Sequence, residues 1–200
     1  MSEQQAPTIQ LAIDQAVQQH TAGHLSQAQT LYQQILQRNP NQPVALHLLG
    51  VVAHQTGKND TAVELITKAL AIKPDYVEAL SNLGNVLWGL GELEEAVASC
   101  RKALDLQPDF AEAHINLGNA LQDLGKLDEA VAFYRKALDL QPDFSGAHFN
   151  LGKALLELGQ HKKGLEHLQK GKGMIHFSNN EQNFKQQISN RDTSNASRVM

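Results

Sequence analysis

The sequence predicts an all-α solenoid of antiparallel helix pairs, and three regularities support this prediction. Between chain breakers, the apolar residues keep a helical rather than a two-residue period. Prolines recur every 34 residues, at Pro40, Pro74, Pro108 and Pro142. Two series of glycines have the same spacing: Gly23, Gly57, Gly91, Gly125 and Gly159, and Gly50, Gly84, Gly118 and Gly152. A fixed period of this length is typical of stacked units, because a single unit cannot bury its own apolar face.

The period divides most of the chain into five units, and we expect the solenoid to span residues 9–175. The third and fourth units are the most alike. The first and the last diverge most, as expected of end units that have one face on solvent. The predicted unit boundaries are 9–42, 43–76, 77–110, 111–144 and 145–178.

The two ends of the chain differ in composition from the repeats. We expect residues 1–8 to form a flexible N-terminus. Residues 176–200 are polar and rich in Asn, Ser and Gln. A segment with so few apolar residues does not order by itself, although a short helix over 183–189 would be able to cap the last unit.

Each unit reads as two short helices, as the fourth unit illustrates. Pro108 ends the preceding helix, because its ring cannot join the hydrogen-bonded ladder. Asp109 stands three residues before Glu112, which is the spacing of a capping box at a helix start. Gly125 ends the first helix, because glycine adopts the left-handed conformation at least cost. A second helix is expected over residues 127–141.

Small residues at fixed positions predict how the two helices pack. Gly118 in the first helix and Ala130 in the second allow a close antiparallel approach, and larger side chains there would cost about 1–3 kcal/mol. Cys100 aligns with Tyr134 and Leu168, so we interpret it as a core residue. Stacking of these pairs places the first helices on an inner, concave surface.

These features together resemble the tetratricopeptide repeat. The resemblance rests on the 34-residue period, on Leu-Gly in the first helix, on Ala in the second and on the closing proline. It implies a right-handed superhelix that binds proteins without catalysing a reaction. The first unit departs from the pattern with Gln15 and Ala16 in place of Leu-Gly. The usual tryptophan is replaced by Leu46, Leu80, His114 and His148.

Asparagines recur on the first helices although Asn is a poor residue for a helix interior. An amide offers both donors and an acceptor, so a row of amides is able to pair with a peptide backbone. This row resembles the asparagine ladder of O-linked N-acetylglucosamine transferases, which implies a mode of binding and not their enzymatic activity. The alternative is that the amides bond helix to helix and fix the stacking. The candidate binding residues are Asn82, Asn85, Trp88, Asn116, Asn119, Gln122, Asp123, Asn150 and Lys153.

Two members of this set have further interpretations. Trp88 is either an aromatic anchor for a partner or a packing residue against the next unit. Lys153 is the one cation beside the amides. The carboxylate clamp of chaperone co-factors needs lysines where this chain has Ser81, Ile115 and Phe149. We therefore do not expect a clamp for an acidic C-terminus.

Composition and motifs argue against other functions. A net charge of −4 disfavours nucleic-acid or anionic-lipid partners. The single cysteine and the spacing of the histidines predict no metal site, and no catalytic motif or cofactor loop is present, so we expect no enzyme and no cofactor. The chain has no signal-peptide pattern and no apolar run of about 18–20 residues, which favours a cytoplasmic protein without a membrane span.

Two functions fit these observations best. The first is a non-catalytic scaffold whose concave groove holds a peptide or helix of a partner protein. The alternative is a substrate-docking arm of a transferase or oxygenase system whose catalytic domain lies on another polypeptide. The amphipathic first unit also makes homo-oligomers through the end repeats a possible arrangement.

Overall fold

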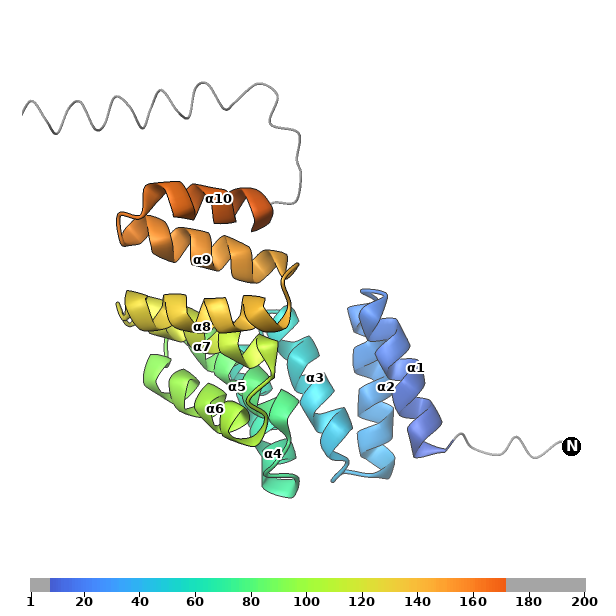
Figure 1. Cartoon of the computed structure of the whole chain (residues 1–200). Helices are drawn as coiled ribbons and strands as arrows, with labels where there is room; N and C mark the ends of the chain where they lie inside the picture. Colours follow the sequence, from blue (N-terminus) through green and yellow to red (C-terminus); the bar gives the residue numbers. More distant parts are fainter. Residues whose placement is uncertain (1–7, 172–200) are drawn as a thin grey trace, which may run out of the picture.

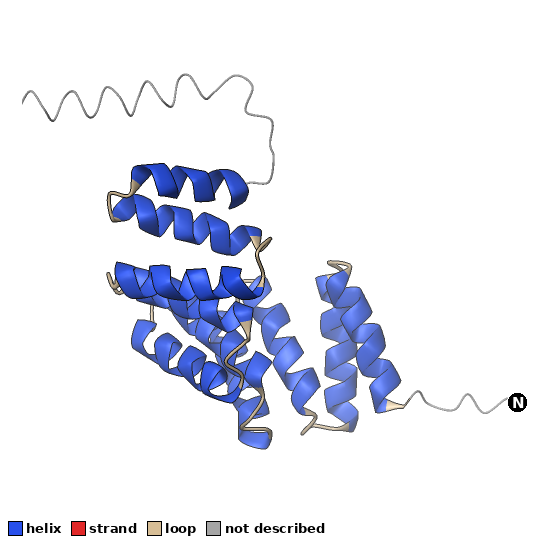
Figure 2. Ribbon diagram, viewed as in Figure 1, coloured by secondary structure: helices blue, strands red, loops and turns tan. Residues whose placement is uncertain are grey.

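The computed structural model describes residues 8–171, and that part of the chain contains ten helices and no strand (Figures 1 and 2). The all-α solenoid is therefore confirmed. Residues 1–7 and 172–200 lie outside the described residues, and with them most of the predicted N-terminus, the whole polar tail and the proposed 183–189 helix. The helices are α1 (Ile9–Thr21), α2 (Leu25–Arg38), α3 (Pro43–Gln55), α4 (Asn59–Ile72), α5 (Val77–Leu90), α6 (Leu93–Leu106), α7 (Ala111–Asp123), α8 (Leu127–Leu140), α9 (Ser145–Glu157) and α10 (His161–Gly171).

Each pair of helices is joined by a turn that contains one glycine of the first series. Gly125 has φ +74, a left-handed conformation, so the expected glycine stop is confirmed. Its N–H bonds to the carbonyl of Gln122 at 2.9 Å, and the N–H of Lys126 bonds to the carbonyl of Leu121 at 2.8 Å. These two bonds satisfy carbonyls that the end of α7 would otherwise leave without partners.

The predicted capping box is wrong. The N-cap residues of α5 and α7 are Tyr76 and Phe110, and neither helix start has a side-chain cap. Phe110 packs instead against a buried cluster that includes Leu80 and Ala103. The entry of the chain into these helices is thus fixed by burial of an aromatic ring, which displaces the aspartate from the cap position.

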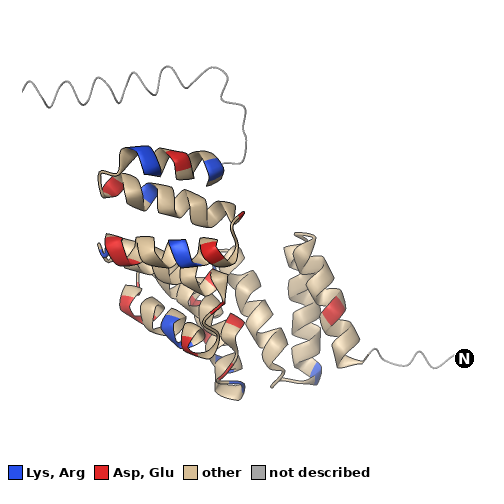
Figure 3. Ribbon diagram, viewed as in Figure 1, with Lys and Arg blue, Asp and Glu red and all other residues tan. Residues whose placement is uncertain are grey.

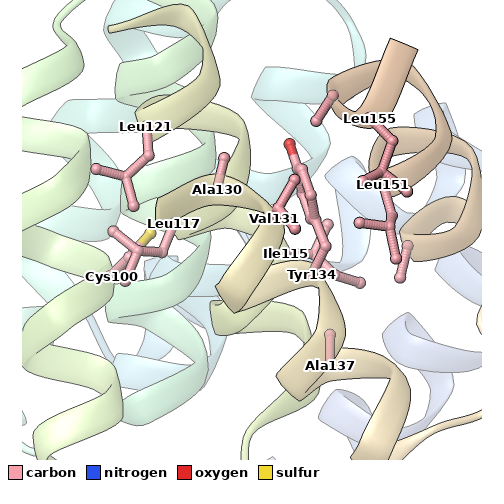
Figure 4. Packing of buried hydrophobic residues seen from close by; sticks show 12 residues of the cluster. Cys100, Ile115, Leu117, Leu121, Ala130, Val131, Tyr134, Ala137, Leu151 and Leu155 are labelled. Carbon is pink, nitrogen blue, oxygen red and sulfur yellow. The ribbon is translucent and has the colours of Figure 1, made fainter. Parts of the chain in front are cut away.

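The helices of one unit pack through the second glycine series. A Cβ atom on Gly118 would lie 2.5 Å from Cε1 of Tyr134, so only glycine leaves room for the ring. Gly84 faces the sulfur of Cys100 in the same way. The expected small residue was therefore correct, although the side chain it accommodates is Tyr134 more than Ala130. Figure 4 shows Tyr134 between its own helix and Leu151 and Leu155 of α9.

Cys100 is fully buried, as predicted. Burial raises the pKa of its thiol to about 12. The thiol is therefore protonated at neutral pH and behaves as a small apolar side chain.

The stacking of the units makes the first helices the inner layer. Successive first helices touch one another, as α5 does α7, whereas no two second helices are in contact within residues 8–171. Elements on the inner side of a curved stack lie closer together than those on the outer side. The first helices α1, α3, α5, α7 and α9 therefore line the concave surface of the right-handed superhelix.

Candidate functional site

The candidate site is a polar face that recurs on three neighbouring first helices. On α7 this face consists of Glu112, Asn116, Asn119 and Asp123, whose spacing places them on one side of a helix. The amides are half-buried and the two acids are exposed. Aligned residues on α5 and α9 complete what we call the groove face: Glu78, Asn82, Asn85 and Gly89, and Gly146, Asn150, Lys153 and Glu157.

Two asparagines of the groove face bond to the preceding unit through their amide nitrogens. Asn82 Nδ2 lies 2.8 Å from Nε2 of His47. Asn116 Nδ2 donates to the hydroxyl of Ser81 at 3.0 Å and to its backbone carbonyl at 3.2 Å. Both pairs join residues 35 positions apart, which places the partner one unit back and one residue earlier on the first helix.

Two more asparagines bond backwards at a spacing of 31. Asn85 Nδ2 lies 3.3 Å from Nε2 of His54. Asn150 Nδ2 donates to Oδ1 of Asn119 at 2.8 Å. Of the predicted row of amides, only Asn119 and Asn150 bond directly to each other within the described chain, and the other asparagines bond to His or Ser of the preceding unit.

Trp88, Gln122 and their partners form a parallel row nearer the ends of the first helices. Trp88 Nε1 donates to Oδ2 of Asp123 at 2.6 Å, and Gln122 Nε2 donates to Oε1 of Glu157 at 2.7 Å. Trp88 also packs against a buried cluster that includes Ala120 of the next unit. The packing interpretation of Trp88 is therefore confirmed, and its role as a partner anchor stays a prediction.

Tyr134 connects the two rows from the second helix of its unit. Its hydroxyl lies 2.9 Å from Oδ1 of Asn119 and 3.1 Å from Oε1 of Gln122. Burial raises the pKa of Tyr134, and the carboxylates of Asp123 and Glu157 raise it further. The hydroxyl therefore keeps its proton and acts as the donor to these two carbonyl oxygens.

His47 is a buried histidine of this network. Its side chain is 2% exposed and packs edge-on against the ring of Tyr76. The amide nitrogen of Asn82 can only donate, so His47 Nε2 accepts and its proton lies on Nδ1. Nδ1 has no partner in the described part of the chain. Burial, followed by the charge of His20, lowers the pKa of His47 to about 4.

Sequence reasoning missed four partners of the candidate residues. They come from first helices and from one second helix, and they do not belong to the Asn series: His47, His54, Ser81 and Tyr134. Polar pairs that recur at spacings of 31 and 35 were the available signal. A comparison of units at the spacing of 34 alone does not reveal these pairs.

Removal of the bond between Trp88 and Asp123 is expected to cost stability. Because both side chains are partly solvated, we expect a coupling energy of about 1 kcal/mol. A double-mutant cycle with Trp88→Phe and Asp123→Ala, followed by urea denaturation, measures this energy. A coupling energy indistinguishable from zero would show that the two units stack without this contact.

The repeat sequence and this helix stack place the chain in a known family. Family models described as TPR repeat match residues 52–91, 89–125 and 118–159, and one described as Tetratricopeptide repeat matches residues 31–64. The chain therefore belongs to the tetratricopeptide repeat family, as its resemblance implied. Proteins of this fold are in general protein-interaction scaffolds, and they are typically non-catalytic.

Solved structures share the fold across most of their length. TTC0263, a thermophilic TPR protein of Thermus thermophilus, is 25% identical with a TM-score of 0.74, over 86% of this chain and 93% of that one. MamA AMB-1 is 28% identical with a TM-score of 0.65, over 80% and 95%. PilF of Pseudomonas aeruginosa, at 21% identity and a TM-score of 0.72 over 82% and 74%, shows the fold alone. No curated protein matches the chain at a significant level.

Two features are absent from residues 8–171. No helix there is long and apolar enough to cross a membrane. No group of three or more His, Cys, Asp or Glu side chains in this stretch is arranged to hold a metal ion.

Proposed function

We propose that this protein is a non-catalytic scaffold whose groove face holds an extended or helical segment of a partner protein. One observation carries the proposal. The carbonyl oxygens of Asn82, Asn85, Asn116 and Asn150 have no partner among residues 8–171, and none is a buried unpaired atom. Each amide thus uses its nitrogen to stack the repeats and leaves its oxygen open to the groove.

The energy available from these oxygens sets the kind of binding. At about 0.5–1.5 kcal/mol net for each hydrogen bond, four contacts give a few kcal/mol. A backbone-directed row of this strength supports weak binding that depends little on the partner's sequence. Lys153, which is exposed on α9, adds one polar contact beside the row.

An apolar stretch continues the groove face toward the N-terminus. Aligned positions on α3 are occupied by Val44, Leu48 and Val51, all half-buried, and α3 carries no Lys, Arg, Asp or Glu. A partner with apolar side chains at one end would gain burial there at about 25 cal/mol per Å². The amides would align the chain of the partner and α3 would add selectivity.

Replacement of the asparagines is a poor test of this proposal, because their amides also hold the repeats together. A better test places a photo-crosslinking amino acid, p-benzoylphenylalanine, at Gly89. This residue is exposed on the groove face, and a Cβ there would come no closer than 3.6 Å to His54. The matched control carries the same amino acid at Ala132, which is exposed on the second helix α8.

We expect irradiation in the native cell to join a protein partner to the chain at position 89 and not at position 132. Mass spectrometry of the adduct identifies the joined segment. Equal adducts at both positions, or none at position 89, would contradict a partner in the groove.

A further inference from the structure

We infer that the partner segment is positively charged, with lysine or arginine side chains that face the groove. This inference rests on the proposed function and specifies its partner by chemistry. It follows from two independent features of the inner surface. One is the direction in which the amides point, and the other is the distribution of charge between the first and second helices.

The groove face carries hydrogen-bond acceptors that the repeat stacking leaves unused. The stacking bonds use an N–H of Asn82, Asn85, Asn116 and Asn150, which leaves their four carbonyl oxygens for a ligand. Asn119 is the reverse case, because its oxygen already accepts from Asn150 and Tyr134 and its Nδ2 is left over. The four oxygens can each accept a hydrogen bond from an N–H group of a ligand, and ammonium and guanidinium groups are donors without acceptors.

The acids of this face have unused capacity as well. One carboxylate oxygen of Asp123 accepts a hydrogen bond from Trp88, and one of Glu157 accepts a hydrogen bond from Gln122. The second oxygen of each has no partner within residues 8–171. Glu78 and Glu112 are exposed at the other end of the same face, in the first turns of α5 and α7. Lysine and arginine form charge-assisted bonds with such carboxylates.

Charge is segregated between the two layers of helices (Figure 3). The five first helices contain five acidic residues and one basic residue, Lys153, whereas the five second helices contain nine of each sign. The outer layer is therefore balanced and the inner layer is negative. A concave surface of one sign attracts ligands of the opposite sign and repels those of its own.

An acidic segment fits this groove poorly. The positions that would carry a lysine clamp hold Ser81, which is buried, and Ile115 and Phe149, which are apolar. Lys153 alone faces the acids of three helices. The surface thus selects against carboxylate-rich partners as well as for basic ones.

The test compares two fluorescein-labelled peptides of about twelve residues, which span about 40 Å when extended. One alternates lysine with alanine and the other alternates glutamate with alanine. Binding is followed by fluorescence anisotropy at low salt and at about 0.5 M salt. We expect the wild type to bind the lysine peptide, to bind it more weakly in high salt, and not to bind the glutamate peptide.

A pair of charge-reversed variants locates the binding. Glu78→Lys with Glu112→Lys changes aligned residues in the first turns of α5 and α7, on the groove face. The control, Glu94→Lys with Asp128→Lys, changes aligned residues in the first turns of α6 and α8. It alters the net charge and the charge at two helix N-termini by the same amount as the first variant. We expect the first variant to weaken binding of the lysine peptide about tenfold and the second less than about twofold.

Equal weakening by the two variants, or tight binding of the glutamate peptide, would overturn the inference. The photo-crosslink at position 89 separates this outcome from failure of the proposed function. If acidic segments are joined there, the groove binds a partner and the charge assignment is wrong. If nothing is joined at position 89, the proposed function itself fails.

Discussion

Replacement of Gly118 by alanine is expected to lower the stability of the solenoid by about 2 kcal/mol. The added Cβ would lie 2.5, 2.8 and 3.0 Å from three ring carbons of Tyr134, and that ring is fully buried. Displacement of the ring also strains the bonds of its hydroxyl to Asn119 and Gln122. A decrease of about 6 °C in Tm, measured by circular dichroism, corresponds to this loss in a chain of this size.

Gly146→Ala is the matched control. Gly146 lies in the first turn of α9, and a Cβ there would come no closer than 3.6 Å to the ring of Phe144. Because alanine is the better helix residue, we expect stability to be unchanged or to rise by about 0.5–1 kcal/mol. If the two variants have the same Tm, close packing at Gly118 does not determine the stability of the stack.

The first unit has an extra methyl group at this position. Ala16 aligns with Gly118 and stands in the unit whose tyrosine is Tyr32. The helices α1 and α2 are in less extensive contact than the helices of the later pairs. An end unit tolerates this looser packing because it has one neighbour only, whereas Gly118 lies between two units.

A second large effect is expected when the pH falls. The pKa of His47 is about 4 in the folded protein, because of burial and then the charge of His20, against 6.5 for the free side chain. Below pH 6.5 the unfolded chain binds a proton that the folded chain does not, so stability falls with pH until about pH 4. The difference in pKa corresponds to about 3 kcal/mol.

The variant His47→Gln isolates this contribution. Glutamine offers Asn82 an acceptor and does not titrate, so we expect its loss of stability between pH 7 and pH 4.5 to be about 2–3 kcal/mol smaller than that of the wild type. Urea denaturation at the two pH values measures the difference. Equal losses in the two proteins would show that His47 is protonated in the fold without penalty.

The repeat units could be predicted from the sequence because their determinants are local. Gly125 ends α7 in a left-handed conformation, since no other residue adopts it as cheaply. The start of the same helix could not be predicted in this way. Asp109 has the spacing of a cap, but Phe110 takes the cap position because its half-buried ring packs against the core. Burial of an aromatic side chain outweighs a cap bond worth about 1 kcal/mol.

The positions of the candidate site residues could be predicted from the sequence, but their hydrogen-bond partners could not. The period of 34 placed Asn82, Asn116 and Asn150 at the same position of successive first helices, and the structure does so. The bonds of their amides depend on how far one unit advances and rotates against the next. That geometry pairs residues 31 and 35 apart, such as Asn116 with Ser81.

The sequence by itself thus determined the helices, their turns and the family, because these depend on spacing along one chain. Only the tertiary structure decided which end of each amide is used. The nitrogen of Asn82 bonds to His47 because stacking brings the two side chains together, and its oxygen is left without a partner within residues 8–171. A side-chain amide is equally able to donate and to accept, so its direction is set by whichever neighbour packing places beside it.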